Sequence, residues 1–114
     1  MSAPNVTAVV VNWNGSDCIV PCLETLLASD YESLSVIVID NASTDGSPEL
    51  VRRRFPGVRV IETGTNAGYA GGANIGLAAA VEEEADFAFV LNNDVEFETG
   101  CVSALVRAAA ERAD

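Results

Sequence analysis

Four short runs of mainly apolar residues recur along this chain, and each of them ends in a cluster of polar residues. The runs are Val6–Val11, Leu34–Ile39, Val58–Ile61 and Phe87–Leu91. A run without regular polar alternation is typical of a strand that is covered on both faces, as in a parallel sheet. We therefore expect four strands, and we expect Phe87–Leu91 to be buried on both faces.

Segments with helical spacing of apolar residues lie between and after these strands. Ser16 or Asp17 can cap the first helix. A short helix is expected over Pro48–Phe55, with Ser47 as its N-cap. The apolar positions that share one face of a longer helix are Ile19, Cys22, Leu23, Leu26 and Leu27, then Ala70, Ala73, Leu77, Ala78 and Val81, and last Val102, Leu105, Val106 and Ala109.

Strands that alternate with helices predict an α/β fold with right-handed crossovers. The expected architecture is a Rossmann-like, mostly parallel sheet of about four strands with helices on both faces. Parallel strands place their carboxyl ends at one edge of the sheet, where open α/β sheets bind ligands. The polar clusters expected at that edge are Asn12–Asn14, Asp40–Asp45, Thr63–Asn66 and Asn92–Asp94.

The composition limits the classes of function. The 114 residues, 49% of them hydrophobic, suit one globular domain. The net charge is −11 and arginine is the only basic residue type, so nucleic acid is an unsuitable partner. This acidic composition fits a halophile or, alternatively, a GC-rich genome that favours arginine and alanine over lysine. Three cysteines without a C-x-x-C motif, and no histidine, argue against a zinc site and against Ser-His or Cys-His catalysis.

The sequence also bears on localisation. The apolar runs are too short to span a membrane, and Met1–Asn5 does not resemble a signal peptide. We therefore expect a cytoplasmic protein.

Two common nucleotide-binding motifs can be tested against the polar edge. A dinucleotide-binding turn needs G-x-G-x-x-G after the first strand, where this chain has only Gly15. A P-loop needs a lysine, which the sequence lacks. Asp94 follows a rigid strand and is placed to hold a hard cation or a sugar hydroxyl. The alternative for Asn92–Asp94 is an Asn/Asp turn that ends a strand.

Four motifs occur in the order and at the spacing of a known family. They are VVVNWNG (Val9–Gly15), VIDNASTDGS (Val38–Ser47), NAGYAGGANIG (Asn66–Gly76) and VLNNDVEF (Val90–Phe97). Together they resemble the N-terminal half of family 2 glycosyltransferases, which have the GT-A fold. The WNG and LNND variants resemble the rhamnosyltransferase-like branch. The resemblance covers nearly the whole chain and implies that residues 1–114 are a single sugar-nucleotide-binding domain.

The resemblance implies roles at the nucleotide end of a donor site. Asn12, Trp13 and Asn14 would border the base, with Trp13 stacking on it or closing the pocket. The alternative for Trp13 is a packed aromatic residue. Asp40 matches the nucleotide-binding aspartate of the family, and its alternative is a turn residue. Asp45 is expected to cap the following helix.

The glycine-rich motif lies beside the implied nucleotide. Asn66, Gly68 and Asn74 match the family's loop at this place, and Asn74 is expected to form a hydrogen bond at the site. Glycine lets a backbone approach a ligand closely or pack tightly, and both uses are open for Gly71 and Gly72.

Asn92, Asn93 and Asp94 occupy the position of the family's DxD motif. The resemblance implies that Asp94 coordinates Mg²⁺ or Mn²⁺, which bridges the diphosphate, and that Asn92 and Asn93 contact the nucleotide sugar. Such a cation stabilises the charge that develops on a departing nucleoside diphosphate. Because Asn92 replaces the first aspartate, one carboxylate remains. Strand alternation predicts that Glu96 shares a face with Asp94.

The resemblance implies an enzyme that transfers a sugar from a UDP-, dTDP- or GDP-sugar to a saccharide or lipid-linked acceptor. Family members are considerably longer, and their second half supplies the acceptor site and the catalytic base. We therefore expect residues 1–114 to be truncated before that half, to bind the donor without turnover and to self-associate through exposed sheet edges. The full-length protein would lie in the cytoplasm or at the inner face of the membrane. The alternative is a non-catalytic binding or interaction module on the same scaffold.

Overall fold

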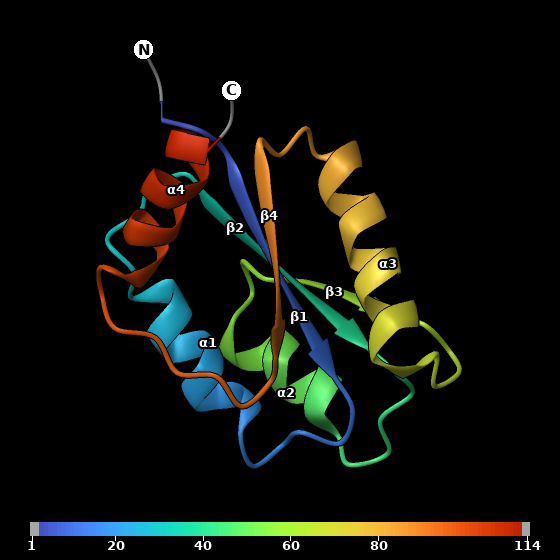
Figure 1. Cartoon of the computed structure of the whole chain (residues 1–114). Coiled ribbons are helices and arrows are strands. Elements are labelled where there is room, and N and C mark those ends of the chain that lie inside the picture. Colours follow the sequence, from blue (N-terminus) through green and yellow to red (C-terminus); the bar gives the residue numbers. More distant parts are fainter. Residues whose placement is uncertain (1–2, 113–114) are drawn as a thin grey trace.

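Residues 3–112, which the computed structural model of this chain describes, contain a parallel four-stranded sheet with the order β3-β2-β1-β4 (Figure 1). The strands are β1 (Val6–Asn12), β2 (Leu34–Asp40), β3 (Arg59–Glu62) and β4 (Phe87–Asn92). All four expected strands are present. The parallel α/β architecture that their alternation with helices predicts is confirmed.

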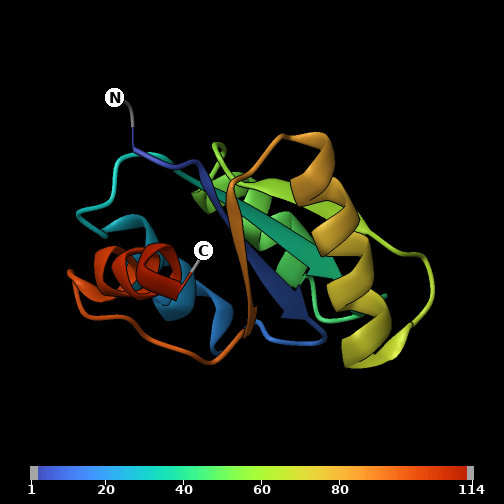
Figure 2. The ribbon, with the colours of Figure 1, turned by 45° about the horizontal axis from the view of Figure 1, so that its top comes forward.

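Helices cover both faces of the sheet. α1 (Ile19–Leu27), α2 (Ser47–Arg54) and α4 (Cys101–Arg112) pack on one face, and α3 (Gly68–Glu82) packs on the other (Figures 1 and 2). Right-handed crossovers explain this division, because the chain moves from β1 to β3 in one direction and returns to β4 in the other. None of the helices in residues 3–112 has the length and apolar character needed to cross a bilayer.

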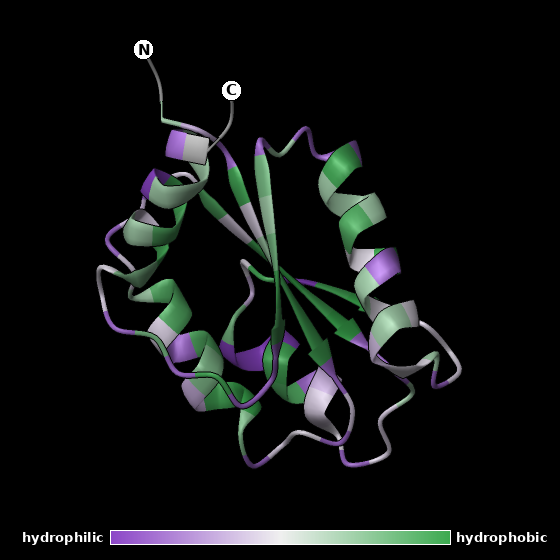
Figure 3. Ribbon diagram, in the orientation of Figure 1, coloured by the Kyte–Doolittle hydropathy of each residue, from purple (hydrophilic) through white to green (hydrophobic). Residues whose placement is uncertain are grey.

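The strand register brings the carboxyl ends of the strands level. Asn12 of β1 pairs with Asp40 of β2, and Val11 pairs with Asn92 of β4. The loops that follow the strands therefore gather at one edge, at the bottom of Figure 1. The strands carry mainly hydrophobic residues, while hydrophilic residues are frequent in the loops (Figure 3).

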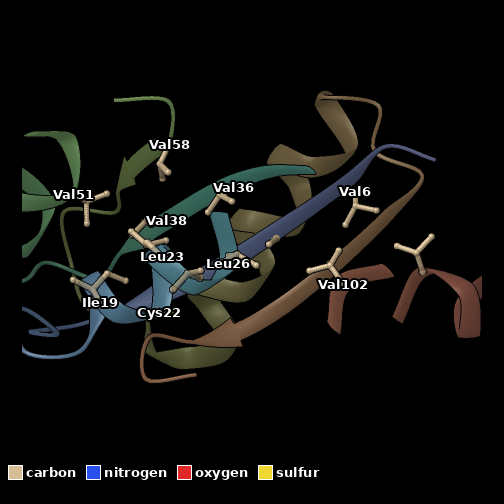
Figure 4. Close-up of a cluster of buried hydrophobic side chains, with 13 residues drawn as sticks. Val6, Ile19, Cys22, Leu23, Leu26, Val36, Val38, Val51, Val58 and Val102 are labelled. Carbon is tan, nitrogen blue, oxygen red and sulfur yellow. The ribbon is translucent and has the colours of Figure 1, made fainter. Parts of the chain in front are cut away.

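The larger core lies between the sheet and the three helices on its first face. Leu23 and Leu26 of α1 pack in one cluster with Val36 and Val38 of β2 (Figure 4). Burial of each such side chain contributes about 1.5–3 kcal/mol. β1 is buried along its whole length, from Val6 to Asn12, so the site at its carboxyl end is built on the most enclosed strand of the sheet.

Helix α3 turns its small residues, rather than its large ones, toward the sheet. The buried residues of this helix are Gly72, Gly76, Ala79 and Ala80. The face that the sequence grouped as apolar is wrong as a buried face, since Val81 is 75% exposed and Leu77, Ala70 and Ala78 are also exposed.

Close packing explains the orientation of α3. A Cβ atom on Gly76 would overlap the side chain of Val9, and one on Gly72 would lie 3.0 Å from Val11 Cγ1. The branched side chains of β1 fill the space that larger helix residues would need. Gly72 therefore serves tight helix packing, which was one of the two uses left open for it.

Strand β4 is less buried than its apolar sequence predicts. Phe87, Phe89 and Leu91 are half-buried on the side of α1 and α4, and Ala88 is exposed on the other side. The expectation of burial on both faces was wrong because β4 is an edge strand. Apolar character alone does not distinguish a central strand from an edge strand. Leu27 and Leu105 are likewise exposed, contrary to their grouping with buried positions.

The expected helix caps also differ in part. Cys18, rather than Ser16 or Asp17, occupies the N-cap position of α1. α2 begins at Ser47 with Gly46 as its N-cap, so Ser47 is not the cap. Asp45, predicted to cap this helix, lies one residue before the N-cap, and its Oδ1 accepts a hydrogen bond from the backbone N–H of Ser47 at 3.0 Å.

Candidate functional site

The side chain of Asn12, at the end of β1, joins three loops at the carboxyl edge. Its Nδ2 donates to Asp40 Oδ1 and to Ser47 Oγ, both at 2.9 Å. Its Oδ1 accepts a hydrogen bond from Asn93 Nδ2 at 2.8 Å. Asn12 is 0% exposed, so all of these contacts lie within the protein. They link the ends of β1, β2 and β4, as the parallel topology predicts.

Asp40 is a buried carboxylate that is satisfied by hydrogen bonds. Besides Asn12, it accepts from the backbone N–H of Ser43 at 3.0 Å and from Ser43 Oγ at 2.7 Å. Asp40 is 0% exposed. A buried charge needs such partners because desolvation is costly. A nucleotide would reach this carboxylate only after neighbouring side chains moved, so the contact with the base or ribose stays a prediction.

The loops after β1 and β2 are also joined at Asn14. The backbone N–H of Asn14 donates to Ser43 Oγ at 2.8 Å, and its Oδ1 accepts from the backbone N–H of Thr44 at 2.8 Å. Asn14 has a positive φ of 49°, a conformation that asparagine tolerates better than most residues. Its side chain therefore fixes the loop geometry beside Trp13.

Asp45 forms a second bridge between the same loops. Its Oδ2 accepts from the backbone N–H of Ser16 at 2.9 Å, and its Oδ1 accepts from Ser47 Oγ at 2.6 Å. Burial opposes ionisation of this carboxyl, but the hydrogen bonds from Ser47 and Ser16 outweigh it and lower the pKa of Asp45 to about 2. Asp45 is therefore ionised across the physiological pH range.

Trp13 projects from this braced region. It lies between buried Asn12 and the hydrogen-bonded Asn14, and it is 56% exposed. The alternative of a packed core aromatic is wrong for this structure. A large, exposed indole on a fixed loop offers a stacking surface for a planar ligand.

The loop after β4 approaches the side chain of Asn12 through Asn93. Gly15 makes this approach possible, because a Cβ atom there would overlap Asn93 Nδ2 and Asn12 Oδ1. Asn92 and Asp94, on either side of Asn93, are exposed. The structure thus brings Asn12, Asp40 and Asn93 together and leaves the Asp94 carboxylate accessible.

The thiol of Cys18 shows which carboxylates lie near the start of α1. Burial raises the pKa of Cys18, and the negative charges of Asp94, Asp17 and Asp45 raise it further. Asp94 and Asp45, which belong to loops far apart in the sequence, thus act on the same thiol. The hydrogen bonds of Asn12 to Asp40 and Asn93 likewise bring the loops after β2 and β4 to the same edge.

The loop after β3 is held by Asn41. Asn41 Nδ2 donates to the carbonyl of Gly68 at 3.0 Å, and Asn66 Oδ1 accepts from the backbone N–H of Gly68 at 2.9 Å. Gly68 has a φ of +73°, which favours glycine. Asn74 is exposed on α3 and lies outside the hydrogen-bond network found within residues 3–112, so its predicted contact stays untested.

Several residues of the network were not predicted as part of the site. They are Ser43, Ser47, Asp45 and Asn41, which hold the loops against one another. The dense run of Ser, Thr, Asn and Asp after β2 is the signal that could have found them. Such side chains bond nearby backbone groups, but only the fold shows that their partners lie in another loop.

Asp94 fits a divalent cation only with help from a ligand. Mg²⁺ and Mn²⁺ prefer oxygen donors such as carboxylates. Within residues 3–112, no group of three or more acidic, cysteine or histidine side chains is arranged to hold a metal. β4 ends at Asn92, so strand alternation does not extend to Asp94 and Glu96, which are both exposed. One carboxylate suits a cation whose other oxygens come from a diphosphate and water.

A cavity of about 350 Å³ lies at the opposite edge of the sheet, between the start of β1, the start of β2 and the end of α3. Its lining includes Thr7, Glu32, Ser35 and Glu83. These are not the residues of the four motifs, and amino ends of parallel strands are not the usual ligand edge. We therefore assign the candidate site to the carboxyl edge.

Comparison with known proteins identifies the family of this chain. Residues 7–114 match the glycosyl transferase family 2 domain. The chain belongs to this glycosyltransferase family. The family predicted from the four motifs is therefore confirmed, and with it membership of a family of enzymes.

A curated relative of this family 2 domain is the N-acetylglucosaminyl-diphospho-decaprenol L-rhamnosyltransferase of Mycobacterium tuberculosis. The two are 37% identical in an alignment 101 residues long, and the match covers 78% of this chain and 33% of the relative. The chain thus spans about a third of that protein's length.

Two solved structures share the fold. TarS 1-349 of S. aureus in complex with UDP-GlcNAc has a TM-score of 0.81 at 22% identity, covering 94% of this chain and 31% of that one. The mannosyltransferase PcManGT from Pyrobaculum calidifontis, in complex with GDP-Man and Mn²⁺, has a TM-score of 0.77 at 27% identity. That match covers 99% of this chain and 33% of the other.

Proposed function

We propose that this family 2 domain binds a nucleotide-diphosphate sugar at the carboxyl edge of its sheet, with Mg²⁺ or Mn²⁺ at Asp94, for glycosyl transfer to an acceptor. The observation that carries the proposal is the chain of hydrogen bonds from Asp40 through Asn12 to Asn93. It makes one connected site from three loops that the sequence separates widely, at the edge where α/β sheets bind ligands.

The chemistry of this edge suits such a donor. Trp13 offers an exposed aromatic surface for a base, beside a loop held by Asn14 and Ser43. The domain has a net charge of −11, so a diphosphate needs a cation to offset repulsion. Asp94, exposed at the end of β4, is the carboxylate of the motif that is available to hold that cation.

Relatives support the ligand class and the acceptor class. PcManGT, at 27% identity, was solved with GDP-Man and Mn²⁺. The rhamnosyltransferase relative is named for an N-acetylglucosaminyl-diphospho-decaprenol, which supports a saccharide or lipid-linked acceptor for the whole protein. We assign the donor as a UDP-, dTDP- or GDP-sugar.

The part of the reaction proposed for this chain is limited by how much of its relatives it matches. This chain spans about a third of the rhamnosyltransferase, and we assign no acceptor site or catalytic base to residues 3–112. Residues 1–114 alone are proposed to bind the donor without turnover. We place the full-length protein in the cytoplasm or at the inner face of the membrane, and we expect the open edges of β3 and β4 to permit self-association.

A titration with one intrinsic probe tests the proposal. Trp13 is the single tryptophan, so its fluorescence reports on the site. UDP, dTDP and GDP are titrated with and without Mn²⁺ into the wild type and Asp94→Ala. We expect the nucleotide to quench the fluorescence of Trp13 in a saturable way. Mn²⁺ should raise the nucleotide affinity at least about tenfold in the wild type but not in Asp94→Ala.

A matched variant controls for general charge effects. Glu98→Ala removes an exposed carboxylate from the same β4–α4 connection and should behave like the wild type. If none of the three nucleotides binds at any salt concentration, the proposal is wrong and the non-catalytic interaction module gains support.

A further inference from the structure

The amide of Asn12 has one orientation that its partners allow. A carboxylate accepts hydrogen bonds and does not donate them, so Asp40 Oδ1 must face Asn12 Nδ2. Ser47 Oγ donates to Asp45 Oδ1 at 2.6 Å and accepts from the same Nδ2 at 2.9 Å. Asp40 directly, and Asp45 through Ser47, therefore fix which end of the amide faces the loop after β2.

The fixed amide dictates the orientation of Asn93. Asn12 presents only Oδ1 toward β4, so Asn93 must turn its Nδ2 to this oxygen, at 2.8 Å. The contact is partly buried, and Gly15 lies against both side chains with no Cβ atom to separate them. The amide of Asn93 is thus oriented by carboxylates that it does not touch.

Two anchors hold the loop that carries Asp94. Asn93 is attached to Asn12 on one side, and on the other the backbone N–H of Phe97 donates to Thr25 Oγ1 of α1 at 3.0 Å. Asp94 directly follows the first anchor. A site with one carboxylate depends on the placement of that carboxylate more than a site with several ligands does.

We propose that Asn12 is a positioning residue for the cation end of the donor site, acting through Asn93 to place the Asp94 carboxylate. This inference rests on the proposed function, since it concerns the same cation. It assigns Asn12 a role through neighbouring side chains rather than through direct contact with the donor, because its side chain is fully buried and bonds Asp40 and Asn93. The Asn93 side chain must be able to donate a hydrogen bond to Asn12 Oδ1, and a side chain of the same size without a donor would not hold the loop.

A matched pair of variants separates polarity from charge. Asn93→Asp and Thr99→Asp each add one negative charge to the connection that carries Asp94, but only residue 93 contacts Asn12. In Asn93→Asp a carboxylate would face Asn12 Oδ1, and the anchor would be lost. Mn²⁺ affinity is measured by electron paramagnetic resonance with UDP or GDP present. We expect Asn93→Asp to bind Mn²⁺ at least about tenfold more weakly than Thr99→Asp. Equal affinities would overturn the proposal.

A pair of uncharged variants keeps the proposal testable if Asn93→Asp does not fold. Asn93→Ala removes the hydrogen bond without adding charge, and Thr99→Ala is its control at an exposed residue of the same connection. The melting temperature of each variant verifies that it is folded. The same order of Mn²⁺ affinities is expected, with Asn93→Ala the weaker binder, and the reverse order would refute the role of Asn12.

The hydrogen-bond relay can be tested without any ligand. In the wild type the side-chain amide protons of Asn12 are buried and should exchange slowly with solvent in NMR spectra. Asn93→Asp should accelerate this exchange on the order of tenfold, while Thr99→Asp should not. Unchanged exchange in Asn93→Asp contradicts the relay. Absence of nucleotide binding by the wild type contradicts the proposed function instead, so the two failures are distinguishable.

Discussion

The ends of β2 and β4 carry similar short runs of asparagine and aspartate, but the protein uses them differently. At the end of β2, Asp40 is fully buried and accepts hydrogen bonds from Asn12 and Ser43. At the end of β4, Asn92 and Asp94 are exposed, and only Asn93 between them reaches the same network. The first aspartate is enclosed by the fold, whereas Asp94 remains accessible to a ligand.

This difference shows how one edge of the sheet can be held rigidly and still leave a side chain accessible to a ligand. Buried polar groups that are fully bonded hold loops in one arrangement, since breaking any of the bonds leaves a desolvated group unpaired. An exposed carboxylate contributes little to folding but keeps its capacity to bind a cation. Asn93, which follows the exposed Asn92 and precedes Asp94, connects the two parts.

The largest expected effect comes from removing one aspartate of each kind. Asp40→Ala should lower the free energy of unfolding by about 3 kcal/mol, because it leaves buried donors of Asn12 and Ser43 without their acceptor. Asp94→Ala should change it by less than about 0.5 kcal/mol, since this side chain is exposed. Urea denaturation followed by circular dichroism measures both.

Cation binding should be affected in the opposite order: folded Asp40→Ala should bind Mn²⁺ better than Asp94→Ala does. Asp94→Ala should lose the effect of Mn²⁺ on nucleotide titrations while keeping the melting temperature of the wild type. Equal losses of stability in the two variants would remove the distinction between a structural and a ligand-binding aspartate.

The next effect probes the contact that joins the two regions. Gly15→Ala should destabilise the protein by about 2 kcal/mol, because the new methyl group displaces Asn93 or Asn12. Gly57→Ala is the control, since a Cβ atom there meets open space. Thermal denaturation of both proteins tests this, and a Gly15→Ala protein as stable as Gly57→Ala would show that Asn93 moves aside without loss.

Asp45 differs from both Asp40 and Asp94, because it is exposed and yet forms hydrogen bonds that hold two loops together. Its pKa is lowered to about 2, so its contribution to stability is present above pH 4 and is lost as the pH falls toward 2. After allowance for solvent screening we expect about 1 kcal/mol. Urea unfolding of Asp45→Asn and the wild type at about pH 6 and about pH 2.5 should show a difference that shrinks at the lower pH.

Asp17→Asn provides the matched control for this pH dependence. Asp17 is an exposed acid in the neighbouring loop, outside the network formed by residues 3–112. Its replacement should leave the pH dependence of stability unchanged. An Asp45→Asn protein that follows the wild-type curve at every pH would show that hydrogen bonding at Asp45 adds no stability.

The smallest expected effect concerns backbone strain at the two edges. Ala42, in the loop after β2, and Glu84, after α3, have positive φ values of 61° and 60°. Glycine relieves such strain at some cost in conformational entropy, so Ala42→Gly and Glu84→Gly should each raise stability by less than about 1 kcal/mol. Differential scanning calorimetry can resolve the shifts. A loss of stability in Ala42→Gly alone would indicate that the Ala42 methyl group contributes to the network.

Much of the fold was predictable from local sequence. The apolar runs gave the strands, and their alternation with helices implied a parallel sheet with all polar clusters at one edge. The motifs at Asn12, Asp40 and Asn93 were correctly placed near one another because topology alone brings the ends of parallel strands together. The orientation of α3 was not predictable, since Gly76 became buried through the shape of Val9 on a distant strand.

Local pattern thus determined which segments are strands and which edge carries the polar residues, because both follow from the spacing of side chains along the chain. Only the tertiary structure decided that Asp40 is enclosed while Asp94 is exposed, although both follow apolar strands. The physical reason is position in the sheet: β2 ends between β1 and β3, where neighbouring loops supply hydrogen bonds, whereas β4 ends at an open edge.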